Sequence, residues 1–254
     1  MTLTQPLQTT GPGLTGPALS LQDVTKSYPG GVIALDHMSL QVPRGSFLAV
    51  MGPSGSGKST LLHCASGLDQ PTSGTVLLGD TEVTRLSETK RTILRRGRIG
   101  FIFQAYNLVP SLTVEHNITL PLRLAGASVD RSWLKALIER IGLTDLLTRL
   151  PGELSGGQQQ RAAIARSLAA RPDVVFADEP TGALDLETAT EVLTLLRDLV
   201  DEFGQTVVMV THDPAAAAWA HETVVMRNGG IHRHFVRPTA DELTACMRQL
   251  RTRA

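Results

Sequence analysis

The sequence predicts an α/β fold built on a mainly parallel sheet with helices on both faces. Two observations support this prediction. Short apolar runs such as residues 47–51 (FLAVM) have the length and composition of buried strands. Stretches with apolar residues at helical spacing alternate with these runs along most of the chain. Buried apolar strands between helices are typical of a parallel sheet that is covered on both sides.

An N-terminal antiparallel β subdomain is expected before the parallel sheet. Residues 19–24 and 33–42 have the character of strands, and a Pro-Gly-Gly turn at 29–31 joins them. Residues 1–18 are rich in Thr, Gly, Pro and Gln. Because such a composition buries little apolar surface, we expect these residues to form a flexible tail ahead of a domain that spans 19–254.

The parallel sheet and its helices follow in order along the chain. After the strand at 47–51, a glycine-rich turn leads into a helix with Leu61, Leu62, Ala65 and Leu68 at helical spacing. The other expected elements are strands at 99–103, 173–177 and 206–211 and helices at 130–141, 156–170 and 187–202.

Two further regions complete the expected organisation. Residues from about 106 to 163 depart from the strand–helix alternation, so they predict an inserted helical subdomain. Thr239-x-x-Glu242 matches a capping box at the start of a final helix. The buried face of that helix is expected to carry Leu243, Met247 and Leu250.

The composition of the 254 residues narrows the class of protein. The 24 basic and 24 acidic side chains balance, so no net charge attracts the chain to nucleic acid or anionic lipid. Two cysteines, Cys64 and Cys246, are too few for a disulfide framework, which indicates a reducing cytosol. No apolar run reaches the about 18–20 residues needed to cross a bilayer, and no secretory signal is expected.

Residues 52–59 (GPSGSGKS) fit the phosphate-binding loop pattern G-x-x-x-x-G-K-[ST], between an expected strand and an expected helix. The glycines allow backbone N–H groups to turn inward around phosphate oxygens. Lys58 would reach the β- and γ-phosphates, the Ser59 hydroxyl would bind Mg²⁺, and the helix N-terminus would add its positive dipole. The pattern predicts a P-loop NTPase whose nucleotide contacts are Gly52, Pro53, Ser54, Gly55, Ser56, Gly57, Lys58, Ser59 and Thr60.

Two carboxylates end the apolar run at residues 174–179 (VVFADE). Asp178 at the tip of the expected strand is suited to the shell of a Mg²⁺ ion. Glu179 follows it and is suited to orient or deprotonate an attacking water. Alone, such a pair could equally be two solvated acids, but the phosphate loop earlier in the chain favours the catalytic interpretation.

Residues 154–161 (LSGGQQQR) look like the signature sequence of ABC transporter ATPases. Other elements appear in the order of that family. Gln104 after IGFIF resembles the Q-loop glutamine, and Asp185 after Ala-Leu resembles the D-loop aspartate. His212 after VVMVT resembles the switch histidine, and Tyr28 resembles the A-loop aromatic residue. Taken singly, each residue has an ordinary structural explanation, but their common order favours the family.

The resemblance, which covers residue 19 to about 235, implies an ATPase that uses ATP and Mg²⁺. Small residues at the start of the helix after 155 would let a phosphate approach the helix N-terminus closely. In this family the signature faces the γ-phosphate held by a second copy. The resemblance assigns catalysis to Glu179, His212 and Gln104, and Mg²⁺ binding to Ser59, Gln104 and Asp178. It assigns the remaining nucleotide contacts to Tyr28, Ser155, Gly156, Gly157, Gln158 and Asp185.

The segments 103–113, 120–122 and 177–185 look like the lipoprotein-release and macrolide-export type of ABC transporter. Ala183 departs from the asparagine expected there. An ATPase subunit of an amino-acid-type importer remains the alternative. A soluble ABC ATPase that acts on DNA or ribosomes is disfavoured, because the chain has one ATPase unit and no sustained heptads between Lys58 and Ser155.

The implied partners are a second copy of the chain and an integral membrane permease, with no nucleic acid and no membrane span of its own. The implied location is the cytosol, at the inner face of the plasma membrane. The segment 104–124 is apolar for an external region and is expected to receive a permease helix. The basic segment 85–98 could contact lipid headgroups or a membrane partner, although a solvated helix face is the simpler interpretation.

Overall fold

The computed structural model describes residues 16–251, so residues 1–15 of the predicted tail lie outside the described residues. Ala18 is buried, its N–H donates to the carbonyl of Val42 at 2.9 Å, and its carbonyl accepts from Gly79 N–H at 2.8 Å. Ala18, which was predicted to belong to the tail, is therefore bonded to the first sheet. None of the described helices is long and apolar enough to span a membrane.

The larger sheet is mainly parallel, as predicted. Its strand order is β10-β9-β3-β8-β7-β6, and only the terminal pair β9–β10 is antiparallel. Strand β6 has the predicted bounds, whereas the hairpin β9–β10 was not predicted. The strands are β3 Phe47–Met51, β6 Ile99–Phe103, β7 Val174–Asp178, β8 Val207–Val210, β9 Glu222–Arg227 and β10 Gly230–Val236.

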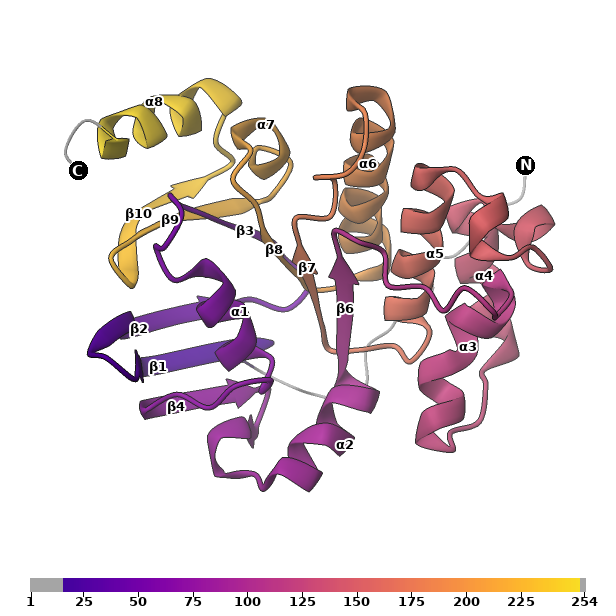
Figure 1. Ribbon diagram of the computed structural model, residues 1–254, viewed down its shortest axis with the longest axis horizontal. Coiled ribbons are helices and arrows are strands. Elements are labelled where there is room, and N and C mark those ends of the chain that lie inside the picture. The colour runs from indigo at the N-terminus through magenta and orange to yellow at the C-terminus, as the bar shows by residue number, and fades with distance from the viewer. Residues whose placement is uncertain (1–15, 252–254) are drawn as a thin grey trace.

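A smaller antiparallel sheet of order β2-β1-β4-β5 lies beside the larger one (Figure 1). Strand β1 extends beyond the predicted residue 24, and β4 and β5 come from a segment in which no strand was predicted. The predicted turn at 29–31 joins β1 to β2. The strands are β1 Leu19–Tyr28, β2 Val32–Val42, β4 Ser73–Leu78 and β5 Thr81–Glu82.

Strand β3 separates two hydrophobic cores. Phe47, Ala49 and Met51 face one core, and Leu48 and Val50 face the other. The first core contains α5, α6 and α8, and the second contains α1 and the antiparallel sheet. Because both faces of β3 are covered, all five of its side chains are buried and no polar–apolar alternation is needed.

The helices cover both faces of the larger sheet, and α3, α4 and α5 pack together on one side of it (Figure 1). These three helices come from the segment predicted to be mostly helical. Leu68 lies beyond the end of α1 and is exposed, contrary to its predicted place on the buried face. The helices are α1 Lys58–Ala65, α2 Glu88–Arg98, α3 Val114–Ala125, α4 Arg131–Ile141, α5 Gly156–Leu168, α6 Leu186–Phe203, α7 Pro214–Ala217 and α8 Ala240–Arg251. Short 3₁₀ turns occupy Val83–Arg85, Thr144–Leu146 and Pro151–Glu153.

The predicted capping box begins helix α8. Glu242 N–H donates to Thr239 Oγ1 at 3.3 Å, and Thr239 N–H donates to the Glu242 carboxylate at 2.8 Å. These bonds satisfy backbone groups that the helix end leaves unpaired. The predicted inner face is also confirmed, because Leu243, Met247 and Leu250 are buried.

Helix α5 lies directly on strand β6 at Gly100. A Cβ atom on Gly100 would come within 2.5 Å of the carbonyl oxygen of Ser167. That distance is shorter than any van der Waals contact, and the atom that a side chain would meet belongs to the backbone. The missing side chain of Gly100 therefore sets how closely α5 approaches the sheet.

Gly100→Ala is expected to destabilise the fold by about 1–3 kcal/mol, because an atom is forced into a packed interior. Gly97→Ala in α2 is the matched control, since its Cβ would meet nothing within 4 Å. Alanine is favoured over glycine in a helix by about 0.8–1.0 kcal/mol, so this control should be stabilised. Urea unfolding monitored by circular dichroism should show a lower midpoint for Gly100→Ala and a higher midpoint for Gly97→Ala than for the unchanged chain. Equal midpoints for the two variants would contradict the close packing of α5 on β6.

Candidate nucleotide-binding site

The phosphate loop connects β3 to α1, as the sequence predicted, and its two outer glycines are required by close neighbours. A Cβ on Gly52 (φ 154°) would lie 2.5 Å from the carbonyl oxygen of Met226 in β9. A Cβ on Gly57 (φ 100°) would lie 2.2 Å from the carbonyl oxygen of Ala34 in β2. The loop is thus held between β9 of the larger sheet and β2 of the smaller one, and only glycine fits at both positions.

Lys58 turns back over the loop. Its ammonium group donates to the carbonyl of Gly52 at 2.8 Å and to that of Pro53 at 2.9 Å. Burial lowers the pKa of Lys58, and the charges of Glu179 and Asp178 oppose that shift. The amine is therefore held against the first two residues of the loop.

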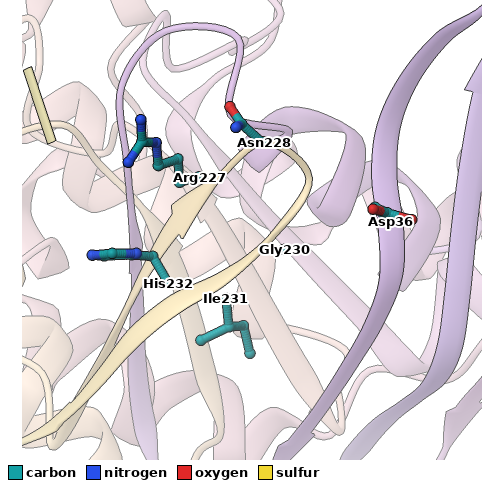
Figure 2. Close-up of a pocket in the computed structure, with 6 residues that line it drawn as sticks. All are labelled: Asp36, Arg227, Asn228, Gly230, Ile231 and His232. Atoms are coloured by element: carbon teal, nitrogen blue, oxygen red, sulfur yellow. The ribbon is translucent and has the colours of Figure 1, made fainter. Parts of the chain in front are cut away.

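The turn between β9 and β10 supports the loop from behind. Gly229 N–H donates to the carbonyl of Ser56 at 3.2 Å, and the Gly229 carbonyl accepts from Asp36 N–H at 3.1 Å. Figure 2 shows the pocket of about 360 Å³ beside this turn, with Asp36 of β2 on one side and Arg227, Asn228 and the start of β10 on the other. The unpredicted hairpin is therefore part of the framework that holds the phosphate loop.

Glu179 follows β7 in a left-handed conformation (φ 47°) that is unusual for a residue other than glycine. Its N–H donates to the carbonyl of Val210 at 2.9 Å. The carboxylate accepts hydrogen bonds from Thr211 Oγ1 and from His212 N–H, each at 3.1 Å. The His212 Nδ1 atom lies 2.7 Å from Glu179 Oε1. The structure thus brings together two of the three residues that the sequence proposed for catalysis, Glu179 and His212.

Asp178 and Gln104 lie next to this pair, at the carboxyl ends of β7 and β6. Burial and the neighbouring charge of Glu179 raise the pKa of Asp178. The Gln104 side chain lies against Gly182, because a Cβ on that glycine would be 2.9 Å from Gln104 Nε2. Parallel strands place their carboxyl ends on one edge of the sheet, which is where ligands bind in open α/β sheets.

Ser59 and Asp178 fit a Mg²⁺ ion by their chemistry. Ser59 is exposed beside Lys58 and carries a hydroxyl, while Asp178 carries a half-buried carboxylate. Magnesium prefers oxygen ligands and often uses one or two carboxylates together with phosphates. These residues and the side-chain oxygen of Gln104 form the predicted donor set.

The signature residues form the N-terminus of α5. Gln158 N–H donates to Ser155 Oγ at 3.3 Å, and Ser155 N–H donates to Gln158 Oε1 at 3.0 Å. A Cβ on Gly157 would lie 2.4 Å from Thr188 Cγ2 in α6, and a Cβ on Gly156 would lie 2.9 Å from Tyr106 Oη. The atoms nearest these glycines therefore come from the start of α6 and from the loop after β6, not from the phosphate loop.

Asp185 caps helix α6 beside the signature. Its carboxylate accepts from Thr188 N–H at 2.9 Å and from Thr188 Oγ1 at 2.7 Å. These hydrogen bonds lower the pKa of Asp185. The capping bonds place the methyl group of Thr188 against Gly157. Within a single copy of the chain, Asp185 therefore acts as the N-cap of α6.

Tyr28 ends β1 and is 37% exposed. Its hydroxyl donates to Asp69 at 3.2 Å, and the ammonium of Lys26 lies 4.9 Å from the ring centroid. Val32 and Ile33, across the following turn, are also exposed. An oriented ring among exposed apolar side chains is suited to stack on a nucleotide base.

Sequence reasoning missed three residues that support the site. Arg166 of α5 donates to the carbonyls of Tyr106 and Asn107, which are both left-handed, with φ values of 57° and 51°. Gln160 of α5 donates to the carbonyl of Pro180, next to Glu179, at 2.5 Å. Gln160 lies within the signature motif and Tyr106 within the segment 103–113, but the sequence did not predict which atoms they contact, and Arg166 belongs to no motif.

A family model described as ABC transporter matches residues 35–182. The chain belongs to the ABC transporter ATP-binding family. Its fold and its phosphate loop agree with that assignment, and ABC ATPases are ATP-hydrolysing subunits of transporters. The family that the sequence predicted is therefore confirmed.

Relatives of this ABC ATPase fall into two groups by length. An uncharacterized ABC transporter ATP-binding protein of Mycobacterium tuberculosis is 46% identical over 77% of this chain and 79% of its own. The ABC transporter ATP-binding protein MJ0796 of Methanocaldococcus jannaschii is 42% identical over 85% of this chain and 95% of its own. The macrolide export ATP-binding/permease protein MacB of Burkholderia pseudomallei is 42% identical over 91% of this chain, which spans only 36% of MacB.

Solved structures of ABC ATPases share this fold. A dimeric MJ0796 structure in a post-hydrolysis state, bound to ADP and Pi, matches with a TM-score of 0.76, 39% identity and coverage of 87% of this chain and 99% of that one. CbiO1 of Clostridium perfringens, part of the cbiONQ complex, matches with a TM-score of 0.80, 27% identity and coverage of 91% and 92%. The ABC ATPase is thus a nucleotide-binding cassette with the predicted α/β architecture.

Tyr28→Ala is expected to weaken ATP and GTP binding alike. Stacking of a base on an aromatic ring contributes about 1–3 kcal/mol and differs little between bases. That loss corresponds to a rise of roughly 5- to 150-fold in Kd. Tyr28→Phe keeps the ring but loses the hydrogen bond to Asp69, so it should bind nucleotide almost as well as the unchanged chain. Titrations with both nucleotides test this, and an unchanged affinity in Tyr28→Ala would remove Tyr28 from the site.

Proposed function

We propose that two copies of this ABC ATPase bind ATP between them and that its hydrolysis powers a membrane permease carried on a separate chain. The observation that supports the shared sites is the position of the signature. Gly156 and Gly157 lie against Tyr106 in the loop after β6 and Thr188 in α6, and no atom of their own phosphate loop is among their nearest neighbours. Ser155 is exposed at the N-terminus of the 13-residue helix α5, where an anion can bind.

A second copy supplies the missing half of each site in this proposal. The γ-phosphate bound by Lys58 of one copy meets Ser155, Gly156, Gly157 and Gln158 of the other. The relative MJ0796 has been solved as a dimer with ADP and Pi, which supports the same arrangement here. Leu186, directly after Asp185, is 84% exposed, and contact with a second copy would remove this apolar side chain from water.

Glu179 is the proposed general base. Its carboxylate accepts a proton from the attacking water, while His212, 2.7 Å away, orients the carboxylate and reaches the γ-phosphate. Ser59, Gln104 and Asp178 would hold Mg²⁺, which would neutralise phosphate charge. Lys58 exchanges its bonds with the carbonyls of Gly52 and Pro53 for bonds with phosphate oxygens.

Export or extraction is the proposed direction of transport. Relatives named macrolide export proteins match nine-tenths of this chain at 42% identity, which favours this type over an importer. The Mycobacterium tuberculosis and Methanocaldococcus jannaschii relatives, which the chain matches over most of their length, are named ATP-binding proteins, which supports a permease on a separate chain. The proposed location is the cytosolic face of the plasma membrane, where ATP and a permease meet.

Two leucines of the segment 104–124 do not line the expected permease groove. Leu122 is buried and Leu108 packs against the same core, so these leucines stabilise the helices rather than a docking surface. From the segment 104–124, Asn107 and Pro121 line a pocket of about 230 Å³ between α2, β6, α3 and α5. We propose this pocket as the place where the permease docks.

Glu179→Gln keeps the size and hydrogen-bonding capacity of the side chain but removes the base. Hydrolysis should therefore fall by about 10²–10⁴ in rate, while ATP still binds. A dimer should accumulate only with ATP, which size-exclusion chromatography with and without ATP measures. Lys58→Ala is the control, because it should weaken nucleotide binding and so form no dimer.

Two outcomes would contradict this function at different points. Near-normal hydrolysis by Glu179→Gln would take the catalytic role away from Glu179. A Glu179→Gln variant that is saturated with ATP yet wholly monomeric would argue against sites shared between two copies.

A further inference from the structure

A surface pocket of about 580 Å³ lies between helices α3 and α4. Both helices lie at one side of the molecule, away from the antiparallel sheet (Figure 1). On α3 the pocket is lined by Glu115, Thr119 and Arg123, which are four positions apart and so share one face of that helix. We call this pocket the α3–α4 groove. None of the described residues that line it belongs to the predicted nucleotide site or lines the proposed permease pocket.

Helices α3 and α4 run in opposite directions. Only residues 126–130 connect them, so the end of α3 lies beside the start of α4. The start of α3 lies beside the segment after α4, because Glu115 N–H donates to the carbonyl of Leu147 at 3.0 Å. The α3–α4 groove therefore extends along both helices, from Arg123 and Arg131 at one end to Glu115 and Leu147 at the other.

The floor of the α3–α4 groove is apolar. Leu134 and Ile138 of α4 are buried, and Leu147 packs against the same core. Val129, which lines the groove at the connection between the helices, is 37% exposed. An apolar groove of this kind is a surface on which an amphipathic helix can lay its apolar face.

The two ends of the α3–α4 groove carry opposite charges. Arg123 and Arg131 are exposed at one end, and no other described residue forms a hydrogen bond or ion pair with either side chain. The Glu115 carboxylate is exposed at the other end and likewise has no partner among the described residues. Between the ends, Lys135 and Glu139 lie 3.8 Å apart and pair with each other. The fold therefore leaves the charges of both ends unpaired.

The stability of helix α4 does not explain the position of Arg131. Arg131 is the first residue of α4, where the helix dipole is positive and favours acidic side chains. A cation at this position is repelled by the helix that carries it. A carboxylate from a partner beside Arg131 would offset that repulsion.

We infer that the α3–α4 groove binds an amphipathic helix of another protein, with a carboxylate at the arginine end, apolar side chains along the floor and an amine at the Glu115 end. Arg123 and Glu115 are eight positions apart in α3, which is about 12 Å along a helix. Two charges seven or eight positions apart on one face of the partner helix would therefore meet both ends. An anionic membrane surface is disfavoured, because it would repel the acidic end.

The α3–α4 groove and the proposed permease pocket use opposite faces of α3. Pro121 lines the permease pocket, whereas Thr119 and Arg123 line the groove. Pro121 is two positions from each of them, which is a rotation of about 200° around the helix. A partner helix and a permease could thus bind at the same time, and the inference does not depend on the proposed function.

Synthetic helical peptides with blocked termini test the inference on the full chain by fluorescence anisotropy. The matched peptide carries glutamate and lysine about eight positions apart, with a stripe of leucines between them on the same face. Two further peptides carry lysine at both positions or glutamate at both, and a fourth has alanine in place of every leucine. The matched peptide should bind best, by roughly 2- to 5-fold over either same-charge peptide, as for one exposed ion pair. The alanine peptide should show no measurable binding.

Arg131→Glu removes the net positive charge of the arginine end, so it should abolish the preference for the matched peptide over the double-lysine peptide. Its urea midpoint should not fall, because the first turn of a helix favours an acidic side chain. Its ATP hydrolysis without peptide should be unchanged. Arg149→Glu is the matched control, because Arg149 is exposed in the same helical region but does not line the groove. This control should keep the preference.

Several results would overturn the inference. Equal affinity for the matched and same-charge peptides, no measurable binding of the matched peptide, or an equal effect of Arg131→Glu and Arg149→Glu would each do so. Self-association of the chain without ATP that Arg131→Glu abolishes, measured by sedimentation, would assign the groove to a second copy instead. A failed peptide test with the expected Glu179→Gln behaviour would reject the groove inference and leave the ATPase function intact.

Discussion

The close approach of two carbonyl groups to the phosphate loop is the constraint on which the rest of the structure depends. Ala34 of β2 and Met226 of β9 belong to different sheets, and their carbonyl oxygens approach Gly57 and Gly52 where any side chain would collide. The loop therefore joins the antiparallel sheet to the parallel one. The pattern that binds phosphate also brings the two sheets together, so binding and folding depend on the same two glycines.

Helix α5 connects the signature to the carboxyl ends of β6 and β7 through successive contacts along its length. Gly157 near its N-terminus meets Thr188 of α6, Gln160 one turn later donates to the carbonyl of Pro180, and Arg166 holds the loop after Gln104. Ser167 at its far end lies on Gly100 of β6. A displacement of the signature would therefore act on the neighbours of Glu179 and Gln104 through one rigid element, not through a flexible loop.

Elements with a strong local pattern were predictable from the sequence, and elements that depend on distant contacts were not. Strand β6 and the capping box of α8 have such patterns. Helix α3 contains Pro121, and proline usually breaks a helix, so its sequence does not read as a continuous helix. Strand β10 is largely exposed, so it lacks the apolar run of a buried strand. The motif residues of the site could be predicted by order along the chain. The roles of Arg166 and Gln160 could not, because they follow from which carbonyls α5 reaches after it packs on β6.

The strained backbone at Glu179 explains how one short segment can place two carboxylates for different roles. Asp178 still belongs to β7, whereas the left-handed conformation at Glu179 turns the chain away from the strand. Such a conformation costs of order 1–3 kcal/mol and persists only where the surroundings stabilise it. Here Val210, the last residue of β8, accepts from the backbone N–H of Glu179, while Thr211 and His212, which follow β8, donate to its carboxylate. The end of the neighbouring strand β8 and the two residues after it therefore hold Glu179 in an orientation that directs its carboxylate toward His212, while Asp178 remains the last residue of β7.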